Sequence, residues 1–250
     1  MVFVGAVAAA LVALFVTWRV RYRYPPAGFP QVLCYHKLTD RFCFEGTWTT
    51  PRRFLDQIDR LVEAGYRFIG EADYLAAVQH GRPQPPNTLL LTFDDGYEEL
   101  YEIYLNHLAP RRVPALVFLV SGYAGRYNTW DLSAGRRRFK HLSWSQIRTM
   151  ADAGARFGSH GATHADLTRV GAGALDDEIA GSKATIESHL GAEVRSFSYP
   201  FGRYSRRVKS AVELAGYTAA FSLYPAHSNE RVDRFALRRN GVYVIDTPRT

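Results

Sequence analysis

The strongest constraint on the fold is a repeated unit, in which a short apolar run of strand length is followed by a longer segment with an apolar stripe at helical spacing. Three of these helical segments end at Gly65, Gly154 and Gly216, and a further strand-like run follows each glycine. Glycine favours the left-handed backbone that commonly ends a helix. Buried strands that alternate with helices predict a mostly parallel sheet, and the number of units favours a closed or nearly closed barrel over two domains.

The expected strands are short apolar runs bounded by turn residues. They lie at residues 32–36, 66–69, 89–93, 115–120, 155–158, 194–199, 217–223 and 241–245. Two helix starts carry recognisable signals. Thr50 can cap a helix that has Pro51 at its first position, and SWSQ at residues 143–146 has the capping-box pattern.

Composition adds bounds on size, charge and cysteine chemistry. The chain has 250 residues, of which 47% are hydrophobic, so it can form one large α/β barrel or two small domains. Its net charge of +7 comes mainly from scattered basic residues, a pattern that does not indicate a nucleic-acid site. Cys34 and Cys43 form no Cys-x-x-Cys pair, so neither a zinc ribbon nor a disulfide framework is indicated, and a single bridge between them stays open.

The amino-terminal segment predicts a membrane anchor. Residues 2–18 contain no charged side chain and approach the minimum length of a spanning helix. Basic residues follow this run instead of preceding it, which favours an anchor over a cleaved signal peptide. We therefore expect a transmembrane anchor with a basic flank at residues 1–24, a linker at 25–29 and a globular domain at 30–250. By the positive-inside rule, the flank would keep that domain in the cytoplasm.

The apolar run at residues 89–93 stops abruptly at two adjacent carboxylates, Asp94 and Asp95, which are followed by Gly96. The carboxyl ends of parallel strands are where α/β barrels carry their catalytic groups, so two acids at this point suggest a site. Asp-Gly is also a common turn dipeptide, and an ordinary turn is the alternative. Only partners elsewhere in the chain can decide between the two.

The expected strand at residues 155–158 runs into a pair of histidines, His160 and His164. Two histidines four residues apart can face one metal ion when the chain between them turns, and Gly161 allows a tight turn. Together with a carboxylate from the Asp94–Asp95 pair they make a two-histidine, one-carboxylate set, which leaves positions open for water and substrate. Two surface histidines are the alternative.

A third segment of interest covers residues 195–202. It is an expected strand broken by Pro200, and Gly202 allows the backbone to turn sharply. This loop could present the backbone amide of Phe201 and an aromatic wall to a substrate, or it could be an ordinary strand end.

Together, these segments resemble the motifs of the polysaccharide deacetylase family, the metal-dependent esterases of carbohydrate esterase family 4 that are built on the NodB homology domain. TFDDG at residues 92–96 resembles the first motif, HGATH at 160–164 the second and FSYPFG at 197–202 the third. The resemblance runs from Pro30 to about Val244, and LCYH at 33–36 is most similar to the poly-N-acetylglucosamine deacetylase branch. It implies a NodB-like catalytic domain folded as a distorted (β/α) barrel of about seven units, similar to a TIM barrel.

Carried over position by position, the resemblance implies that Asp95, His160 and His164 bind a divalent metal, with zinc expected and cobalt or nickel as alternatives. It also implies that Asp94 is the general base. Hydrolysis of an N-acetyl amide needs an activated water as nucleophile and a stabilised oxyanion, and a divalent metal can supply both. The Phe201 backbone N–H would complete the oxyanion hole, a contribution of roughly 3 kcal/mol in comparable sites.

Two features depart from the family pattern. Ser198 stands where many members carry the arginine that orients the base. Arg239, at the place of a late arginine in the poly-N-acetylglucosamine branch, or Arg195 would have to replace it. The late Leu-x-His motif that supplies the general acid is absent, since residues 241–250 contain no histidine. His36, at the end of the first expected strand, is the candidate acid, with a hydrogen-bonded rim histidine as the alternative.

The function implied is a membrane-anchored, metal-dependent hydrolase that removes N-acetyl groups from amino sugars of a polysaccharide, oligosaccharide or lipid-linked glycan. Its expected partners are an N-acetylglucosamine-containing carbohydrate and the membrane, with no nucleic acid. Trp130 and Trp144 could stack on sugar rings or serve as packing. Two alternatives stay open: a catalytically silent barrel that binds a glycan or a partner, and a cytoplasmic deformylase or deacetylase of a small or lipid-linked amide. The family usually acts outside the cytoplasm, whereas the basic flank favours the cytoplasm, so both topologies are kept.

Overall fold

The structure is a computed structural model that describes residues 29–43, 46–81, 84–130, 138–223 and 233–246. Within this part of the chain, nine strands form one sheet in which every pairing is parallel. The strand order is β10-β9-β8-β7-β6-β5-β1-β11, and β4 pairs with β5 off this path. The strands are β1 Gln31–Tyr35, β4 Arg67–Ile69, β5 Thr88–Phe93, β6 Leu116–Leu119, β7 Arg156–Ser159, β8 Ser196–Ser198, β9 Ala219–Ser222, β10 Leu237–Arg238 and β11 Asn240–Gly241. A second, parallel pair consists of β2 Lys37–Leu38 and β3 Trp48–Thr49.

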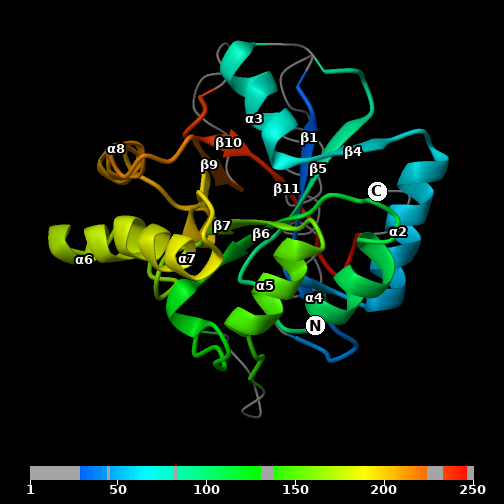
Figure 1. The fold of residues 1–250 in the computed structure, drawn as a ribbon, viewed down its shortest axis with the longest axis horizontal. Coiled ribbons are helices and arrows are strands. Elements are labelled where there is room, and N and C mark those ends of the chain that lie inside the picture. Colours follow the sequence, from blue (N-terminus) through cyan, green and yellow to red (C-terminus); the bar gives the residue numbers. More distant parts are fainter. Residues whose placement is uncertain (1–28, 44–45, 82–83, 131–137, 224–232, 247–250) are drawn as a thin grey trace, which may run out of the picture.

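A single residue, Arg239, joins the two ends of the large sheet. β10 pairs with β9 at one end and β11 pairs with β1 at the other, and Arg239 lies between β10 and β11. The Arg239 amide donates to the Ser222 carbonyl at 2.9 Å, and the Val242 amide donates to the Cys34 carbonyl at 2.9 Å. Backbone hydrogen bonds therefore connect the segment around Arg239 to both ends of the sheet. The result is a near-closed parallel barrel of α/β character, as the sequence predicts (Figure 1).

Helices surround the sheet (Figure 1). They are α2 Pro51–Glu63, α3 Glu71–His80, α4 Leu100–Ile103, α5 Trp144–Asp152, α6 Ala172–Asp176, α7 Ser182–Leu190 and α8 Arg206–Leu214. α4 continues into a π-helical segment at Tyr104–Leu108, and another π-helical segment, Asp177–Gly181, joins α6 to α7. The sequence did not indicate these two wide turns, which are rare and are often found at functional sites.

Alternation along the strands separates the barrel interior from the surface that the helices cover. On β5, Phe93 belongs to the large core shared with the helices. Leu90 packs instead with Phe118 and Phe221 from β6 and β9 inside the barrel. By the same alternation, Asp94 points into the mouth of the barrel.

The helix signals of the sequence are confirmed. The Thr50 side chain accepts a hydrogen bond from the Arg53 amide at the start of α2. Ser143 and Gln146 form the capping box of α5. The three glycines that end the expected helical segments all have positive φ, which explains why glycine stands at each of these positions.

The expected strand at residues 241–245 is shorter than predicted. β11 ends at Gly241, and the chain then turns. In this turn the Tyr243 amide donates to Asp246 Oδ2 at 2.7 Å, and the Asp246 amide donates to the Tyr243 carbonyl at 2.9 Å. The Asp246 side chain therefore accepts the hydrogen bond from the Tyr243 amide, which in a longer strand would have donated to a neighbouring strand.

The expected transmembrane anchor is corrected. Residues 1–28, which contain the expected span at 2–18, lie outside the described residues. In the part of the chain that the structure describes, no helix is long and apolar enough to cross a bilayer. The longest continuous helix there runs from α6 through the π-helical segment to α7, over residues 172–190, and it carries five charged side chains, whereas a span needs about 20 predominantly apolar residues. The described residues therefore give the expected single-pass, membrane-anchored location no support.

We predict that Gly158→Ala destabilises the barrel. A Cβ at this buried position of β7 would lie 2.6 Å from two ring carbons of Phe118 and 2.7 Å from the Ser196 carbonyl oxygen. The interior layer would have to shift, and the expected loss in the free energy of unfolding, measured by urea denaturation, is about 1–3 kcal/mol. Gly173→Ala in α6 is the matched control, because an added Cβ meets no atom within 4 Å there. Equal stability of the two variants would contradict this packing.

Candidate active site at the mouth of the barrel

Polar side chains meet where four strands of the sheet end. His36 follows β1, Asp94 and Asp95 follow β5, His160 follows β7, and Ser198 ends β8. Because the strands are parallel, their carboxyl ends open at the same mouth of the barrel. All five side chains are buried or half-buried. The structure thus brings together residues that are far apart in the sequence.

Three of the residues at the mouth have the spacing of metal ligands. Asp95 Oδ1 lies 3.4 Å from His164 Nε2 and 3.7 Å from His160 Nε2. A tetrahedral zinc ion with ligand bonds near 2.0–2.1 Å separates its ligand atoms by about 3.4 Å. All three side chains are buried, and two imidazoles with one carboxylate are a donor set that suits zinc and its neighbours. The residues present therefore fit a divalent metal.

His160 is held in the tautomer that a metal ligand needs. Its Nδ1 lies 2.7 Å from the Ser198 carbonyl oxygen, which can only accept, so Nδ1 carries the proton and Nε2 keeps its lone pair toward Asp95. Burial lowers the pKa of His160. Burial and the adjacent His160 also bring the pKa of His164 well below its ordinary value. Both rings are therefore neutral at neutral pH, the form that binds a metal.

A buried arginine engages Asp94. Arg239 Nη1 donates to Asp94 Oδ1 and Nη2 donates to Asp94 Oδ2, both at 2.6 Å, and Nη2 also donates to Ser198 Oγ at 2.8 Å. Burial by itself would raise the pKa of Asp94, but the Arg239 guanidinium outweighs it and holds that pKa below its ordinary value. Asp94 is therefore an ionised carboxylate whose plane is fixed by a bidentate pair. Arg195, the other candidate, lies half-exposed and pairs with Glu193.

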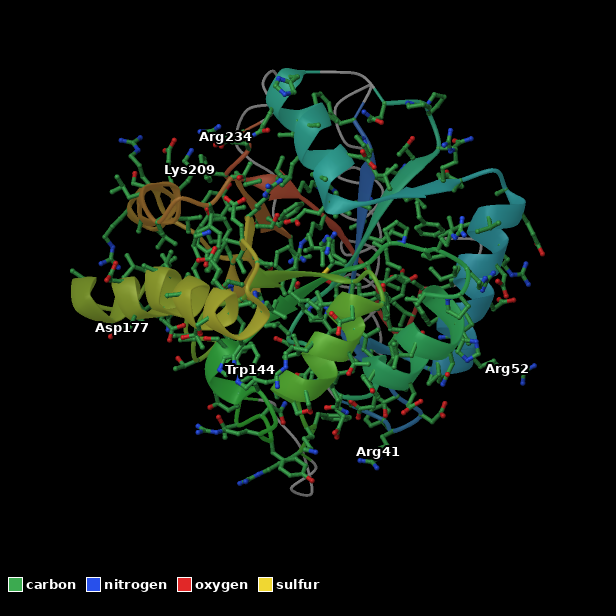
Figure 2. All side chains as sticks on the ribbon, viewed as in Figure 1. Arg41, Arg52, Trp144, Asp177, Lys209 and Arg234 are labelled. Atoms are coloured by element: carbon green, nitrogen blue, oxygen red, sulfur yellow. The ribbon has the colours of Figure 1, made fainter. Side chains whose placement is uncertain are left out.

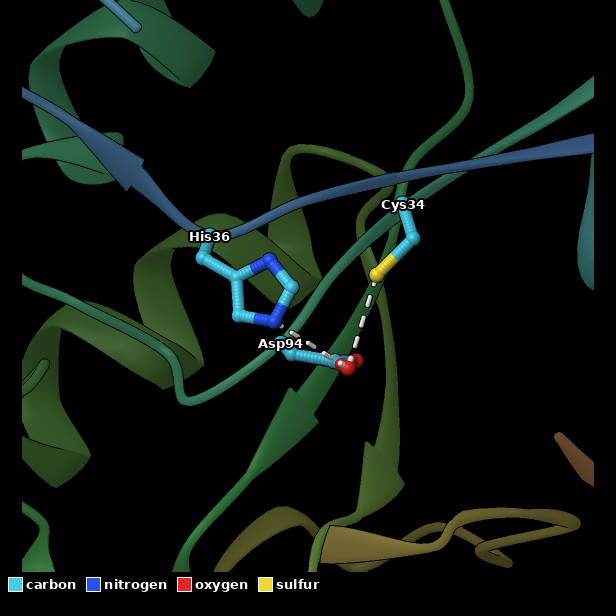
Figure 3. A group of neighbouring side chains, drawn as sticks. All are labelled: Cys34, His36 and Asp94. Carbon is cyan, nitrogen blue, oxygen red and sulfur yellow. Dashed lines mark hydrogen bonds and ion pairs between the residues drawn. The ribbon is translucent and has the colours of Figure 1, made fainter. Parts of the chain in front are cut away.

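A second group of potential metal ligands surrounds Asp94. In Figure 3, Cys34 and His36 approach the Asp94 carboxylate from two sides, with Sγ 3.4 Å and Nε2 3.8 Å from Oδ2. A metal ion there would have to compete with Arg239, which already binds both carboxylate oxygens. Burial raises the pKa of the Cys34 thiol well above its ordinary value, so the thiol stays protonated and donates to Asp94. Cys34 is a free thiol, and no bridge joins it to Cys43.

His36 is a neutral, accessible neighbour of Asp94. Its side chain is 14% exposed, so a substrate at the mouth can reach it. Burial lowers the pKa of His36 to about 4, which leaves the ring neutral at neutral pH. Among the described residues, nothing forms a hydrogen bond to its buried Nδ1. Within the described residues, Nδ1 of His36 therefore lacks the hydrogen bond that the alternative, a hydrogen-bonded rim histidine, would have there.

Aromatic rings flank His164. The Trp130 ring stacks on it with the centroids 4.5 Å apart, and the Phe201 ring meets it edge-on at 4.6 Å. The Phe201 side chain is 45% exposed, so part of this aromatic wall is open to a ligand. Trp144 of α5 instead stacks on His189 of α7, with the ring centroids 4.0 Å apart, which is a packing contact between helices.

Three of the residues at the mouth have a left-handed backbone. Asp95, His164 and Phe201 have φ angles of 68°, 62° and 57°. Residues other than glycine rarely adopt this conformation, which costs on the order of 1–3 kcal/mol each and is concentrated at functional sites. Each of the three motifs therefore contains one strained residue at the mouth.

The sequence did not indicate a role for His141. Its Nδ1 donates to the Asp95 carbonyl at 2.7 Å, so it supports the turn that carries Asp95. The buried ring lies against Tyr97, Tyr123 and Trp130, with centroids 4.9, 5.7 and 5.2 Å away. His141 is at no strand end of the repeat, and no local pattern could have singled it out.

Comparisons with known proteins point to one family. A family model described as polysaccharide deacetylase matches residues 81–220, which is more than half of the chain. The protein YxkH of Bacillus subtilis (strain 168), whose name provisionally places it among polysaccharide deacetylases, is 24% identical over 215 residues. This match covers 86% of the present chain and 71% of YxkH.

Solved structures of two bacterial proteins have a similar fold. The deacetylase PplD of Streptococcus pyogenes, solved in complex with acetate, gives a TM-score of 0.74 at 20% identity and covers 90% of this chain and 96% of its own. IcaB from Ammonifex degensii gives a TM-score of 0.73 at 25% identity and covers 90% of this chain and 95% of its own. Each match thus extends over nearly the whole barrel.

We predict that Arg239→Met strongly destabilises the barrel, because it leaves the Asp94 carboxylate buried without its cation. The expected loss in the free energy of unfolding, measured by urea denaturation, is about 3–5 kcal/mol. The double variant Asp94→Asn/Arg239→Met removes the charge as well and is expected to lose clearly less. In the control Arg195→Met, the broken pair with Glu193 is about half exposed on both sides, so the expected change is about 0–1 kcal/mol. Similar losses for Arg239→Met and Arg195→Met would contradict the pairing.

Proposed function

Because the chain belongs to the polysaccharide deacetylase family, we propose that it removes N-acetyl groups from amino sugars of a polysaccharide, an oligosaccharide or a lipid-linked glycan. Family membership makes it a hydrolase of carbon–nitrogen bonds other than peptide bonds, with carbohydrate as its substrate class. One observation carries the finer proposal. A buried set of three potential metal ligands lies beside Asp94, which Arg239 keeps ionised and oriented.

The proposed metal ligands are Asp95, His160 and His164. Zinc is the proposed ion, with cobalt or nickel as alternatives, because the donors are two neutral imidazoles and one carboxylate at zinc-like separations. When bound, a divalent cation polarises an amide carbonyl and lowers the pKa of a water molecule. Trp130 and Phe201 enclose the His164 side of this site and would limit the access of bulk water.

Asp94 is the proposed general base. Its Oδ2 lies 3.8 Å from His160 Nε2, so the carboxylate is next to the ligand set, while Arg239 occupies both of its oxygens and keeps it outside that set. The guanidinium also keeps Asp94 ionised, which is the form that accepts a proton. We propose that Asp94 takes the proton of the water that attacks the amide carbon.

His36 is the proposed route of the proton to the leaving amine. When the carbon–nitrogen bond breaks, the amine nitrogen must gain a proton. With a pKa of about 4, His36 is neutral before the reaction and has to receive this proton during turnover. Its Nε2 is 3.8 Å from Asp94 Oδ2, so Asp94 is the proposed source. The proton then passes from water to Asp94, to His36 and to the amine, and the charges balance.

Phe201 has two proposed contributions. Its left-handed backbone, with φ of 57°, turns the chain after Pro200, and its amide would bind the oxyanion that forms on the acetyl group. Donors of this kind contribute roughly 3–4 kcal/mol to catalysis. The exposed ring next to His164 would pack against the substrate.

The two alternatives have less support. A catalytically silent barrel would not need a second, ionised carboxylate held by an arginine beside the metal ligands, and family membership argues for an enzyme. A cytoplasmic deformylase or deacetylase of a small amide was suggested only by the basic flank, which lies outside the described residues.

Removal of the metal is expected to stop the reaction. Treatment with a chelator should abolish acetate release from N-acetylglucosamine oligomers, and zinc or cobalt should restore it, because Asp95 and the two histidines would hold the ion. His160→Ala should lower the zinc content of the purified protein, measured by elemental analysis. His189→Ala, which changes the packing contact with Trp144, is the control and should keep both zinc and activity. An unchanged zinc content in His160→Ala would refute the ligand set.

Asp94→Asn is expected to lower kcat for acetate release by about 10²–10⁴-fold, because asparagine keeps the shape of the side chain but cannot accept the proton. The zinc content should stay at one equivalent, since Asp94 is proposed as a base and not as a ligand. Asp56→Asn, in an exposed pair with Arg60, controls for the loss of a charge. Full turnover by Asp94→Asn in a thermally intact protein would rule out the assignment.

A further inference from the structure

The turn between His160 and His164 contains neither helix nor strand, yet it is tightly held. One side chain from a distant part of the chain, Glu178, binds its backbone. Glu178 Oε2 accepts from the amide of Ala162 at 2.8 Å and from the amide of Thr163 at 3.0 Å, and Oε1 accepts from the Thr163 hydroxyl. Glu178 is 5% exposed, so these hydrogen bonds are made largely out of water.

Glu178 also lies directly against Gly161. A Cβ on Gly161 would be 2.7 Å from Glu178 Oε2, so the carboxylate occupies the space that a larger residue would take. The amide of Gly161 donates to Ser159 Oγ at 3.1 Å, and Ser159 Oγ in turn lies 2.7 Å from Ser182 Oγ. Both Glu178 and Ser182 come from the α6–α7 helix, so one helix anchors the start and the middle of the turn.

The π-helical segment Asp177–Gly181 explains how this helix reaches the turn. Each additional residue in a helix rotates all later side chains by about 100°, so a π turn changes the face that the following residues present. Glu178 is buried at the start of the wide turn, and Ser182 is buried directly after it. Asp177, the neighbour of Glu178, is exposed and lies on the outside of the molecule (Figure 2).

We propose that Glu178 is a positioning residue that sets the metal affinity of the site by holding the turn between His160 and His164 in its ligating shape. This inference rests on the proposed role of the two histidines as metal ligands. Glu178 acts through the backbone of Ala162 and Thr163 and is not itself a ligand. Without its carboxylate, two amides and a hydroxyl lose their acceptor, the turn relaxes, and His164 no longer points steadily at Asp95.

The expected size of the effect follows from comparable sites. Residues that support metal ligands through hydrogen bonds typically change affinity by 10–100-fold. Glu178→Gln keeps the size of the side chain but places a donor NH₂ group where donors already converge, so we expect about a 10-fold weaker zinc affinity. Glu178→Ala removes every acceptor, and we expect a loss of up to about 100-fold.

The test measures zinc binding to the metal-free, full-length protein by competition with a chromophoric chelator, with zinc alone as the probe. Asp177→Asn, at the exposed neighbour, is the matched control and should bind zinc like the wild type. His160→Ala should bind poorly. The far-UV circular dichroism and the Tm of each metal-free variant show whether it is folded. At saturating zinc, acetate release by Glu178→Gln should recover most of its lost kcat, a rescue that a general folding defect would not show.

The outcomes separate the inference from the proposed function. Zinc affinity of Glu178→Gln within about twofold of the wild type, beside a deficient His160→Ala, would overturn the role of Glu178 and leave the deacetylase proposal intact. An unchanged affinity in His160→Ala would overturn the ligand assignment itself. If the Glu178 variants do not fold, Thr163→Val decides, because it removes only one of the hydrogen bonds. Weaker zinc binding in Thr163→Val supports the inference, and wild-type affinity refutes it.

Discussion

The buried ion pair between Arg239 and Asp94 is the interaction on which the mouth of the barrel depends. The guanidinium carbon lies inside the barrel, 5.2 Å from the centroid of the Phe118 ring and 6.0 Å from that of Phe221. Two charges in such a place offset their desolvation only with good geometry and further hydrogen bonds, which the paired 2.6 Å contacts and the Ser198 hydroxyl provide. Arg239 is also the residue that joins β10 to β11. The same residue therefore links the two ends of the sheet and orients Asp94.

The sequence predicts those parts of the site that depend on patterns in neighbouring residues, and it does not predict those that depend on contacts between distant segments. Alternation and strand ends are local, so Asp94 and His160 could be assigned to one mouth once the sheet was expected to be parallel. The choice between the two candidate arginines stayed open, because no strand was expected before Arg239. In the structure, Arg195 precedes β8 and so lies at the amino end of that strand, whereas Arg239 follows β10. The roles of His141 and Glu178 could not be predicted. They come from a loop and a π-helical turn, and only tertiary packing brings them to the site.

The departure from the family pattern at Ser198 has an explanation in space and charge. Ser198 is fully buried at the end of β8, and its small side chain leaves room for the Arg239 guanidinium, from which Ser198 Oγ accepts a hydrogen bond at 2.8 Å. An arginine at position 198 would compete for the same carboxylate and the same volume. Two buried cations beside Asp94 would leave one of them unpaired, at a cost of several kcal/mol. An arginine at position 198 and an arginine at position 239 therefore exclude each other. The third motif of this chain lacks its arginine, but Asp94 still has a partner in Arg239.

The pair of adjacent aspartates shows how one turn produces two different carboxylates. Neighbouring residues of an extended strand point to opposite sides, so Asp94 and Asp95 could not both face the mouth without a change in the backbone. The left-handed φ of 68° at Asp95 makes that change, and Gly96, with φ of 67°, continues it in a space where a Cβ would lie 2.7 Å from Leu119. The hydrogen bond from His141 to the Asp95 carbonyl holds this strained turn in place. The Asp-Gly dipeptide is thus a turn, as one alternative posed by the sequence had it, and its two neighbouring carboxylates have different surroundings: Asp94 faces Arg239, and Asp95 faces His160 and His164.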